Sequence, residues 1–170
     1  VDGKPWGPDV ETYDGVPVQL VLTDDAGQRR EVALTPRVME AIEPFTADKS
    51  RPGVLVLRVE QFDKGLGAWM GSELEGLPAD VDVVLDLRGN PGGRLMEAES
   101  VLTCFLPRDQ VWATRTGCSG RPVVLRAAGD CGDRRDPLAN DVAVLVDQGS
   151  RSAAELTPAA LQEARRGIVV

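Results

Sequence analysis

The chain has 170 residues, of which 42% are hydrophobic and 27% are charged, an ordinary composition for a soluble globular protein. Its net charge of -8 argues against a nucleic-acid partner, because phosphate binding requires a basic surface. The sequence contains no His, which excludes a Ser-His-Asp or Cys-His site within these residues, and its three scattered Cys lack the spacing of a zinc site, so no metal is expected.

The N-terminal part of the sequence shows no signal peptide, and no apolar run in the chain approaches the roughly 20 residues of a membrane span. The chain opens on Val1 without an initiator Met, and we expect a processed or truncated start. Residues 16–23 and 30–34 are predicted to form two strands joined by a turn. Residues 36–53 are interrupted by Pro and are predicted to be a linker, with a helical turn around residues 38–42.

From Val54 onward, apolar runs of strand length alternate with segments of helical periodicity. The predicted strands are residues 54–59, 81–87, 142–146 and 168–170. The predicted helices are residues 66–77, 95–105 and 152–165, and residues 111–115 and 122–126 are predicted to form a hairpin. This order predicts an α/β fold with a mixed, largely buried sheet and helices on its faces, because the strands are continuous runs of Val and Leu rather than alternating patterns.

The three Cys residues allow one disulfide. Cys118 and Cys131 flank the predicted hairpin, so a disulfide between them is plausible in an oxidising compartment. Cys104 lies in an apolar run and is predicted to be a small buried hydrophobic residue rather than a nucleophile.

The first candidate functional loop is Asp86–Gly93, which reads D-L-R-G-N-P-G-G after a predicted strand. Gly92 and Gly93 permit backbone conformations closed to other residues and leave their N–H groups unhindered. An oxyanion hole needs donors of this kind, although a simple turn after a strand would use the same residues. The loop is not a phosphate-binding loop, because Lys and Ser or Thr do not follow the glycines.

The second candidate loop is Asp147–Glu155, where a predicted strand ends and a helix begins. Ser152 could cap this helix, and its spacing from Glu155 fits a capping box. The same position suits a nucleophile, because a helix N-terminus stabilises negative charge and the N–H of Ala153 would face a developing oxyanion.

Together the two loops resemble those of the C-terminal processing peptidases, or tail-specific proteases, which use a Ser-Lys dyad. The resemblance runs from about Val54 to Val170 and is strongest in D-L-R-G-N-P-G-G and in V-L-V-D-Q-G-S-R-S-A-A-E-L at residues 144–156. It implies a ClpP- or crotonase-like peptidase core, residues 54–170, that hydrolyses peptides or unfolded proteins without a cofactor. It also implies a bacterial periplasmic or secreted location.

The resemblance assigns roles to single residues. Ser152 takes the position of the nucleophile, and Ala153 and the Gly92-Gly93 loop, more specifically Gly93, take those of the oxyanion-hole donors. Gln162 and Glu163 match a Gln-Asp pair that supports the site in the family.

The sequence departs from the family pattern at three points. Arg151 and Ala154 replace small and Ser residues beside the nucleophile, so substrate access or the pose of the loop could differ. The general-base Lys of the family would lie beyond Val170, so the isolated chain is predicted to be inactive; Lys4, Lys49 and Lys64 do not match that position. Residues 1–35 look like a partial PDZ-like segment, and no peptide binding is assigned to it.

Two other interpretations stay open. The same fold also serves non-catalytic ligand- or peptide-binding proteins, including retinoid carriers that resemble these peptidases. A purely structural α/β domain is the third interpretation. A Lys in a Gly-Lys-Gly-type segment some eight residues beyond Val170 would favour the enzyme.

Overall fold

The computed structural model describes residues 12–38, 42–118 and 120–170. The chain divides into two compact units, Val1–Ile42 and Glu43–Val170. In the first unit, β1 (Val18–Thr23) and β2 (Arg29–Leu34) form an antiparallel pair, as predicted. Whether this segment is PDZ-like stays a prediction, and part of the predicted helical turn around residues 38–42 lies outside the described residues.

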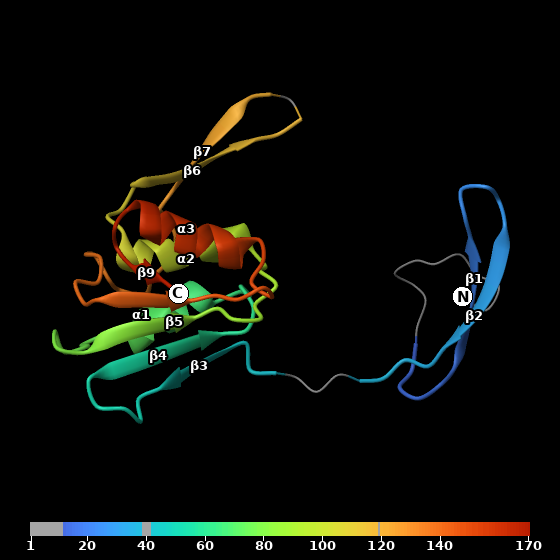
Figure 1. Cartoon of the computed structure of the whole chain (residues 1–170), viewed down its shortest axis with the longest axis horizontal. Helices are drawn as coiled ribbons and strands as arrows, with labels where there is room; N and C mark the ends of the chain where they lie inside the picture. Colours follow the sequence, from blue (N-terminus) through green and yellow to red (C-terminus); the bar gives the residue numbers. More distant parts are fainter. Residues whose placement is uncertain (1–11, 39–41, 119) are drawn as a thin grey trace. The chain divides into compact units, whose positions relative to one another are not determined.

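The second unit is built on a five-stranded sheet with the order β3-β4-β5-β8-β9 (Figure 1). Its strands are β3 (Phe45–Asp48), β4 (Val54–Val59), β5 (Asp82–Asp86), β8 (Val142–Leu145) and β9 (Ile168–Val169). The strand β3 pairs antiparallel with β4, and all other neighbours pair in parallel. The predicted mixed α/β fold is therefore confirmed.

Three helices connect the parallel strands: α1 (Leu66–Glu73), α2 (Leu95–Phe105) and α3 (Ala153–Glu163). From β4 to β9, each connection leads to the next strand on the same side of the sheet order. Because such connections between parallel strands are right-handed, connections that advance in the same direction place their helices on the same face of the sheet. Accordingly, α1 packs against α2 and α2 against α3.

The burial of alternate strand residues agrees with helices that cover one face of the sheet. Leu57, Leu85 and Val144 have no exposed surface, whereas the adjacent Val56 and Val84, which point to the other face, are half-buried. The continuous apolar runs had predicted helices on both faces; in the described part of the chain they cover only one. The sequence pattern misleads here because half-buried Val residues on an open face look like core residues.

The strand β3 lies within residues 36–53, which the sequence had predicted to be a linker. Phe45 pairs with Val59 in β4, and its ring lies 5.2 Å from that of Trp69 on α1. The second unit therefore begins at Glu43 rather than at residue 54. The short strand escapes prediction because three of its four residues are exposed, so it carries no apolar pattern.

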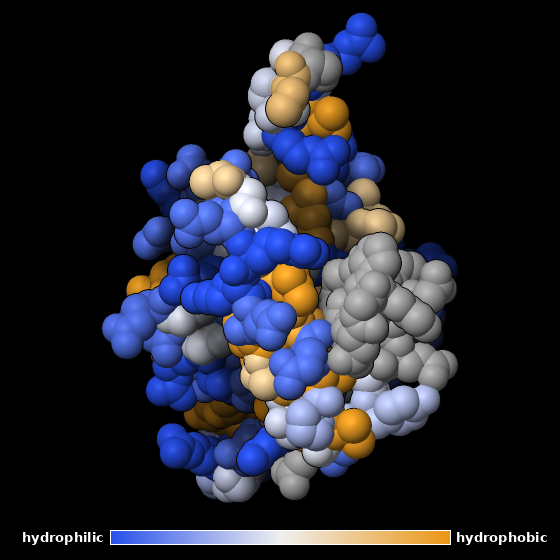
Figure 2. Space-filling view, turned by 90° about the vertical axis from the view of Figure 1, so that its right-hand side faces the viewer, coloured by the Kyte–Doolittle hydropathy of each residue, from blue (hydrophilic) through white to orange (hydrophobic). Residues whose placement is uncertain are grey.

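The hairpin of β6 (Val111–Thr116) and β7 (Pro122–Arg126) was predicted from the sequence and pairs antiparallel. It extends away from the helices, and Figure 2 shows it as a narrow projection at the top, where hydrophilic and apolar residues are mixed. None of the helices in the described part of the chain combines the length and apolar character that crossing a bilayer requires.

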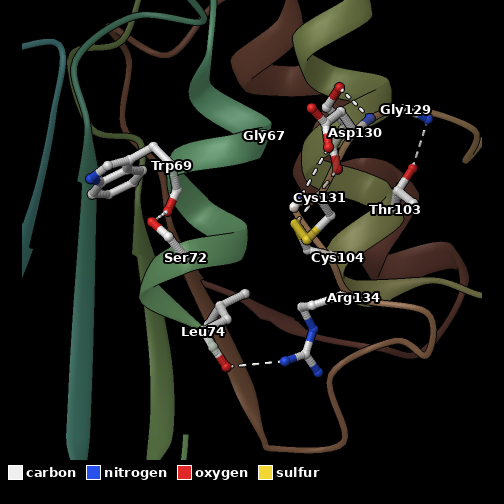
Figure 3. The surroundings of a disulfide bond; sticks show 12 residues. Gly67, Trp69, Ser72, Leu74, Thr103, Cys104, Gly129, Asp130, Cys131 and Arg134 are labelled. Atoms are coloured by element: carbon white, nitrogen blue, oxygen red, sulfur yellow. Dashed lines mark hydrogen bonds between the residues drawn. A yellow bond between two sulfur atoms is a disulfide. The ribbon is translucent and has the colours of Figure 1, made fainter. Parts of the chain in front are cut away.

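The disulfide differs from the sequence-based expectation. Cys104 on α2 is bonded to Cys131, with Cα atoms 5.4 Å apart, whereas Cys118 is free and exposed. The chain after β7 returns to the helices, where Cys131 lies beside α2 (Figure 3), whereas Cys118 lies in the turn of the hairpin, which extends away from the helices (Figure 1). The positions of Cys118 and Cys131 near the hairpin in the sequence therefore did not predict which Cys residues pair.

Candidate active site

The carboxyl ends of β5 and β8, which are neighbours in the sheet, lead into the two candidate loops. Ligand and catalytic sites of α/β proteins form preferentially at this edge. The fold therefore brings together two segments that are about 60 residues apart in the sequence.

Ser152 lies at the sharp turn between β8 and α3. Its φ of 54° and ψ of -119° are rare for a residue other than Gly, and such strain costs about 1–3 kcal/mol. Ser152 is exposed, and its N–H donates a 2.6 Å hydrogen bond to Oε2 of Glu155. In α/β-hydrolases, a strained Ser between a strand and a helix presents the nucleophile.

The glycine loop contacts this turn directly. A Cβ atom at Gly92, where φ is 98°, would lie 2.6 Å from the carbonyl oxygen of Arg151 and 2.7 Å from Cβ of Ser152. A Cβ at Gly93, where φ is 143°, would collide with the carbonyl group of Phe62. Both positions therefore require Gly, and Gly92 is in contact with the backbone beside Ser152.

The N–H groups of the two glycines differ in their partners. Gly92 donates to Oδ1 of Asn90 at 2.8 Å. The buried Asn90 in turn donates from Nδ2 to the carbonyl of Val59 at 2.8 Å, which fixes its amide group. Among the described residues, the N–H groups of Gly93 and Ala153 have no acceptor. Gly93 rather than Gly92 is therefore available as a donor.

Phe62, which follows β4, holds the loop from the other side. Its N–H donates to the carbonyl of Gly92, and its carbonyl accepts from Arg94 N–H, both at 2.8 Å. The sequence analysis missed both Phe62 and the role of Asn90. Asn90 stands within the quoted D-L-R-G-N-P-G-G motif, whereas nothing in the sequence around Phe62 points to the glycine loop.

A charged network lies beneath the glycine loop. Asp86, only 5% exposed, accepts hydrogen bonds from Arg58 Nη1 at 3.0 Å and from Arg88 Nε and Nη2 at 2.9 and 2.7 Å. Burial raises the pKa of Asp86, but hydrogen bonds from Arg88 and the charges of both arginines outweigh it, so the pKa is lowered. The network keeps Asp86 ionised and ties β4 to the start of the loop.

Gln162 and Glu163 do not join Ser152 in this structure. They lie at the C-terminal end of α3, ten and eleven residues from Ser152, which corresponds to about 15 Å or more along the helix. Gln162 instead lines a hollow of about 300 Å³ along α3, together with Asp147, Ala154 and Glu155. The supporting role of Gln162 and Glu163 stays a prediction. Among the described residues, no group of His, Cys, Asp and Glu could hold a metal ion.

The sheet, with its two loops meeting at the carboxyl edge, defines an α/β protein with a candidate site at that edge, and the comparisons with known proteins specify the family. The family model "Peptidase family S41" matches residues 53–170. Because this match covers more than half of the chain, the chain belongs to peptidase family S41.

Curated relatives are named as processing proteases. A carboxyl-terminal-processing protease from Synechocystis sp. is 31% identical over 92% of this chain and 42% of its own length. The carboxy-terminal processing protease CtpB from Bacillus subtilis is 34% identical over 62% of this chain and 20% of its own length. The chain thus spans less than half the length of these relatives.

Solved structures support the fold. The photosystem II D1 C-terminal processing protease matches with a TM-score of 0.61 and 23% identity, over 92% of this chain and 43% of that chain. A lipoprotein from Streptococcus agalactiae matches with a TM-score of 0.56 and 12% identity, over 74% of this chain and 48% of that chain.

Proposed function

We propose that this chain carries the nucleophile and the oxyanion hole of a serine endopeptidase of the C-terminal processing type. Ser152 is the nucleophile, and the N–H groups of Gly93 and Ala153 are the oxyanion donors. The observation that carries the proposal is the contact of Gly92 with the Ser152 turn, because it brings the loop that contains Gly93 against the turn that contains the strained, exposed Ser152 and Ala153. Among the described residues, the N–H groups of Gly93 and Ala153 have no acceptor.

The chemistry follows from these positions. Oγ of Ser152 loses its proton to a base and attacks the scissile carbonyl carbon, and the carbonyl oxygen becomes an oxyanion held by the two N–H groups. The C–N bond then breaks, the amine leaves with a proton, and an acyl-enzyme remains on Ser152. Water hydrolyses this ester and regenerates the hydroxyl group. The N-terminus of α3 favours the negative charge throughout.

The base in this proposal is a Lys outside these 170 residues. The strand β9 runs parallel to β8, and the Val170 carbonyl accepts from the N–H of Val146 at 2.9 Å. A chain that continued beyond Val170 would therefore emerge at the edge of the sheet that carries Ser152. A Lys placed there can act as a base near neutral pH if burial lowers its pKa.

The substrates proposed for the full-length protein are peptides and unfolded proteins, because the curated relatives are named as carboxyl-terminal-processing proteases. A bacterial periplasmic or secreted location, and a PDZ-like role for the first unit, belong to the same proposal and rest on the family resemblance.

The test is hydrolysis of an unfolded, fluorescently labelled protein by the full-length protein that contains these residues. Ser152→Ala should lower the rate at least about 10⁴-fold, because it removes the attacking oxygen. Ser72→Ala removes an exposed hydroxyl on α1 and should leave the rate unchanged. A Ser152→Ala protein that is folded and as active as wild type would refute the assignment. The isolated 170-residue chain should show no turnover.

A further inference from the structure

The two loops of the candidate site are joined through one carboxylate that the catalytic proposal does not use. We propose that Asp147 is a positioning residue whose Oδ1 atom fixes the Asp86–Gly93 loop against the Ser152 turn, so that the two oxyanion donors keep their spacing. This inference rests on the proposed peptidase function and adds a residue to it.

The Oδ1 atom of Asp147 accepts hydrogen bonds from both loops. It binds Gly89 N–H in the first loop at 2.8 Å and Gly149 N–H in the second loop at 2.8 Å. These bonds lower the pKa of Asp147, the one from Gly89 most. A single acceptor atom therefore joins the two backbone segments.

The two loops are in close backbone contact around this atom. A Cβ atom at Gly149 would lie 2.8 Å from Cα of Gly89 and 3.1 Å from Oδ1 of Asp147. The two glycines thus face each other at backbone contact, and the carboxylate oxygen occupies the remaining room. A longer or displaced side chain at position 147 would push the loops apart.

Ser150 adds a second link that depends on the same residue. Its hydroxyl accepts from the N–H of Asp147 at 3.0 Å and donates to the carbonyl of Leu87 at 2.8 Å. A third link runs from Arg151 N–H to the carbonyl of Asn90 at 2.9 Å. In each loop, all three links are made by residues that follow the strand, β5 or β8, and precede the residue with the free N–H group, Gly93 or Ala153.

The links between the two loops matter for the proposed catalysis because the two donors belong to different loops. Gly93 lies in the first loop and Ala153 in the second, so a change in loop register moves one donor relative to the other. An oxyanion hole works only when both donors stand about 3 Å from the developing charge, and a misplacement of about 1 Å can cost about 100-fold in rate.

Two substitutions separate the position of the acceptor from its charge. Asp147→Asn keeps an oxygen acceptor at the same place and removes the charge, whereas Asp147→Glu keeps the charge and displaces the acceptor by one methylene group. Asp141→Asn is the matched control: it removes the charge of an exposed carboxylate at the other end of β8, and its side chain accepts no hydrogen bond from the described residues.

The experiment measures kcat and KM of the full-length protein on a fluorogenic peptide, with Ser152→Ala in the same series. We expect Asp147→Glu to lower kcat about 10- to 100-fold with KM changed less than about threefold, and Asp147→Asn and Asp141→Asn to stay within about threefold of wild type.

The possible outcomes are distinguishable. If Ser152→Ala is inactive but Asp147→Glu retains wild-type kcat, the positioning role is wrong and the peptidase assignment stands. Loss of kcat in Asp147→Asn with normal Asp147→Glu would also overturn the proposal, because charge rather than acceptor position would then matter. An active Ser152→Ala protein would overturn the proposed function itself.

Discussion

Asn90 decides which glycine can serve the site. Its side chain accepts from the N–H of Gly92 and donates to the carbonyl of Val59, and the N–H of Gly93 has no acceptor among the described residues. At the residue scale, the geometry of the candidate site thus depends on Asn90, which is not one of the proposed catalytic groups. Asp86 is a second such group, because it anchors the strand end from which the loop starts.

The pairing of Asp86 predicts a pH dependence of stability. The pKa of Asp86 is lowered in the folded protein, so its contribution is fully present above the unfolded pKa of about 3.9 and is lost as the pH falls through the folded pKa. Asp86→Asn should therefore reduce the free energy of unfolding by about 1–3 kcal/mol at pH 7, and this difference should shrink below about pH 4. Urea unfolding of both proteins across this range measures it.

The exposed Asp82 at the other end of β5 provides the control. Among the described residues it has no ion pair, so Asp82→Asn should change the free energy of unfolding at pH 7 by less than about 0.5 kcal/mol. A difference between wild type and Asp86→Asn that stayed constant from pH 7 to pH 3 would contradict the role given to the Asp86 network.

At the element scale, the helices are held together by the segment after β7. Gly129 N–H donates to Oγ1 of Thr103 at 2.9 Å, and Nη1 of Arg134 donates to the carbonyl of Leu74 at 3.0 Å (Figure 3). The Cys104–Cys131 disulfide lies between these contacts and joins this segment covalently to α2. The segment therefore connects α1 with α2 on the covered face of the sheet.

The disulfide gives a prediction about stability. It closes a loop with a sequence separation of 27 residues, for which the chain-entropy relation gives about 3–4 kcal/mol. Replacing Cys104 and Cys131 together by Ala should lower the free energy of unfolding by this amount in urea titrations. Cys118→Ala, at a free and exposed thiol, should change it by less than about 0.5 kcal/mol. A double variant as stable as wild type would contradict this view.

The elements also show what the sequence can predict. The bounds of β4 and α2 agree with the prediction, because a continuous apolar run and a strong helical period leave little choice. The short edge strand β3 and the pairing of Cys131 depend on contacts between distant segments, so local patterns could not reveal them. Likewise, the sequence identified the two loops of the site but not the contact of Gly92 with Ser152, which tertiary packing creates.

At the scale of the whole molecule, the parallel order from β4 to β9 brings the two loops of the candidate site together. Each parallel strand ends at the same edge, so the loops after β5 and β8 meet there. The same order places all three helices on one face and leaves the other face of the sheet half-buried in the described residues. The arrangement explains why a chain spanning 42% of a curated relative can hold both loops of the candidate site.

The central claim is that Ser152, Gly93 and Ala153 form one catalytic centre. The most direct measurement is a crystal structure of the full-length protein with a peptidyl aldehyde, which mimics the tetrahedral intermediate. The claim predicts a covalent bond from Oγ of Ser152 to the aldehyde carbon, with the resulting oxygen within about 3 Å of the N–H groups of Gly93 and Ala153. An aldehyde bound elsewhere, or an adduct on Ser152 whose oxygen points away from both N–H groups, would contradict it.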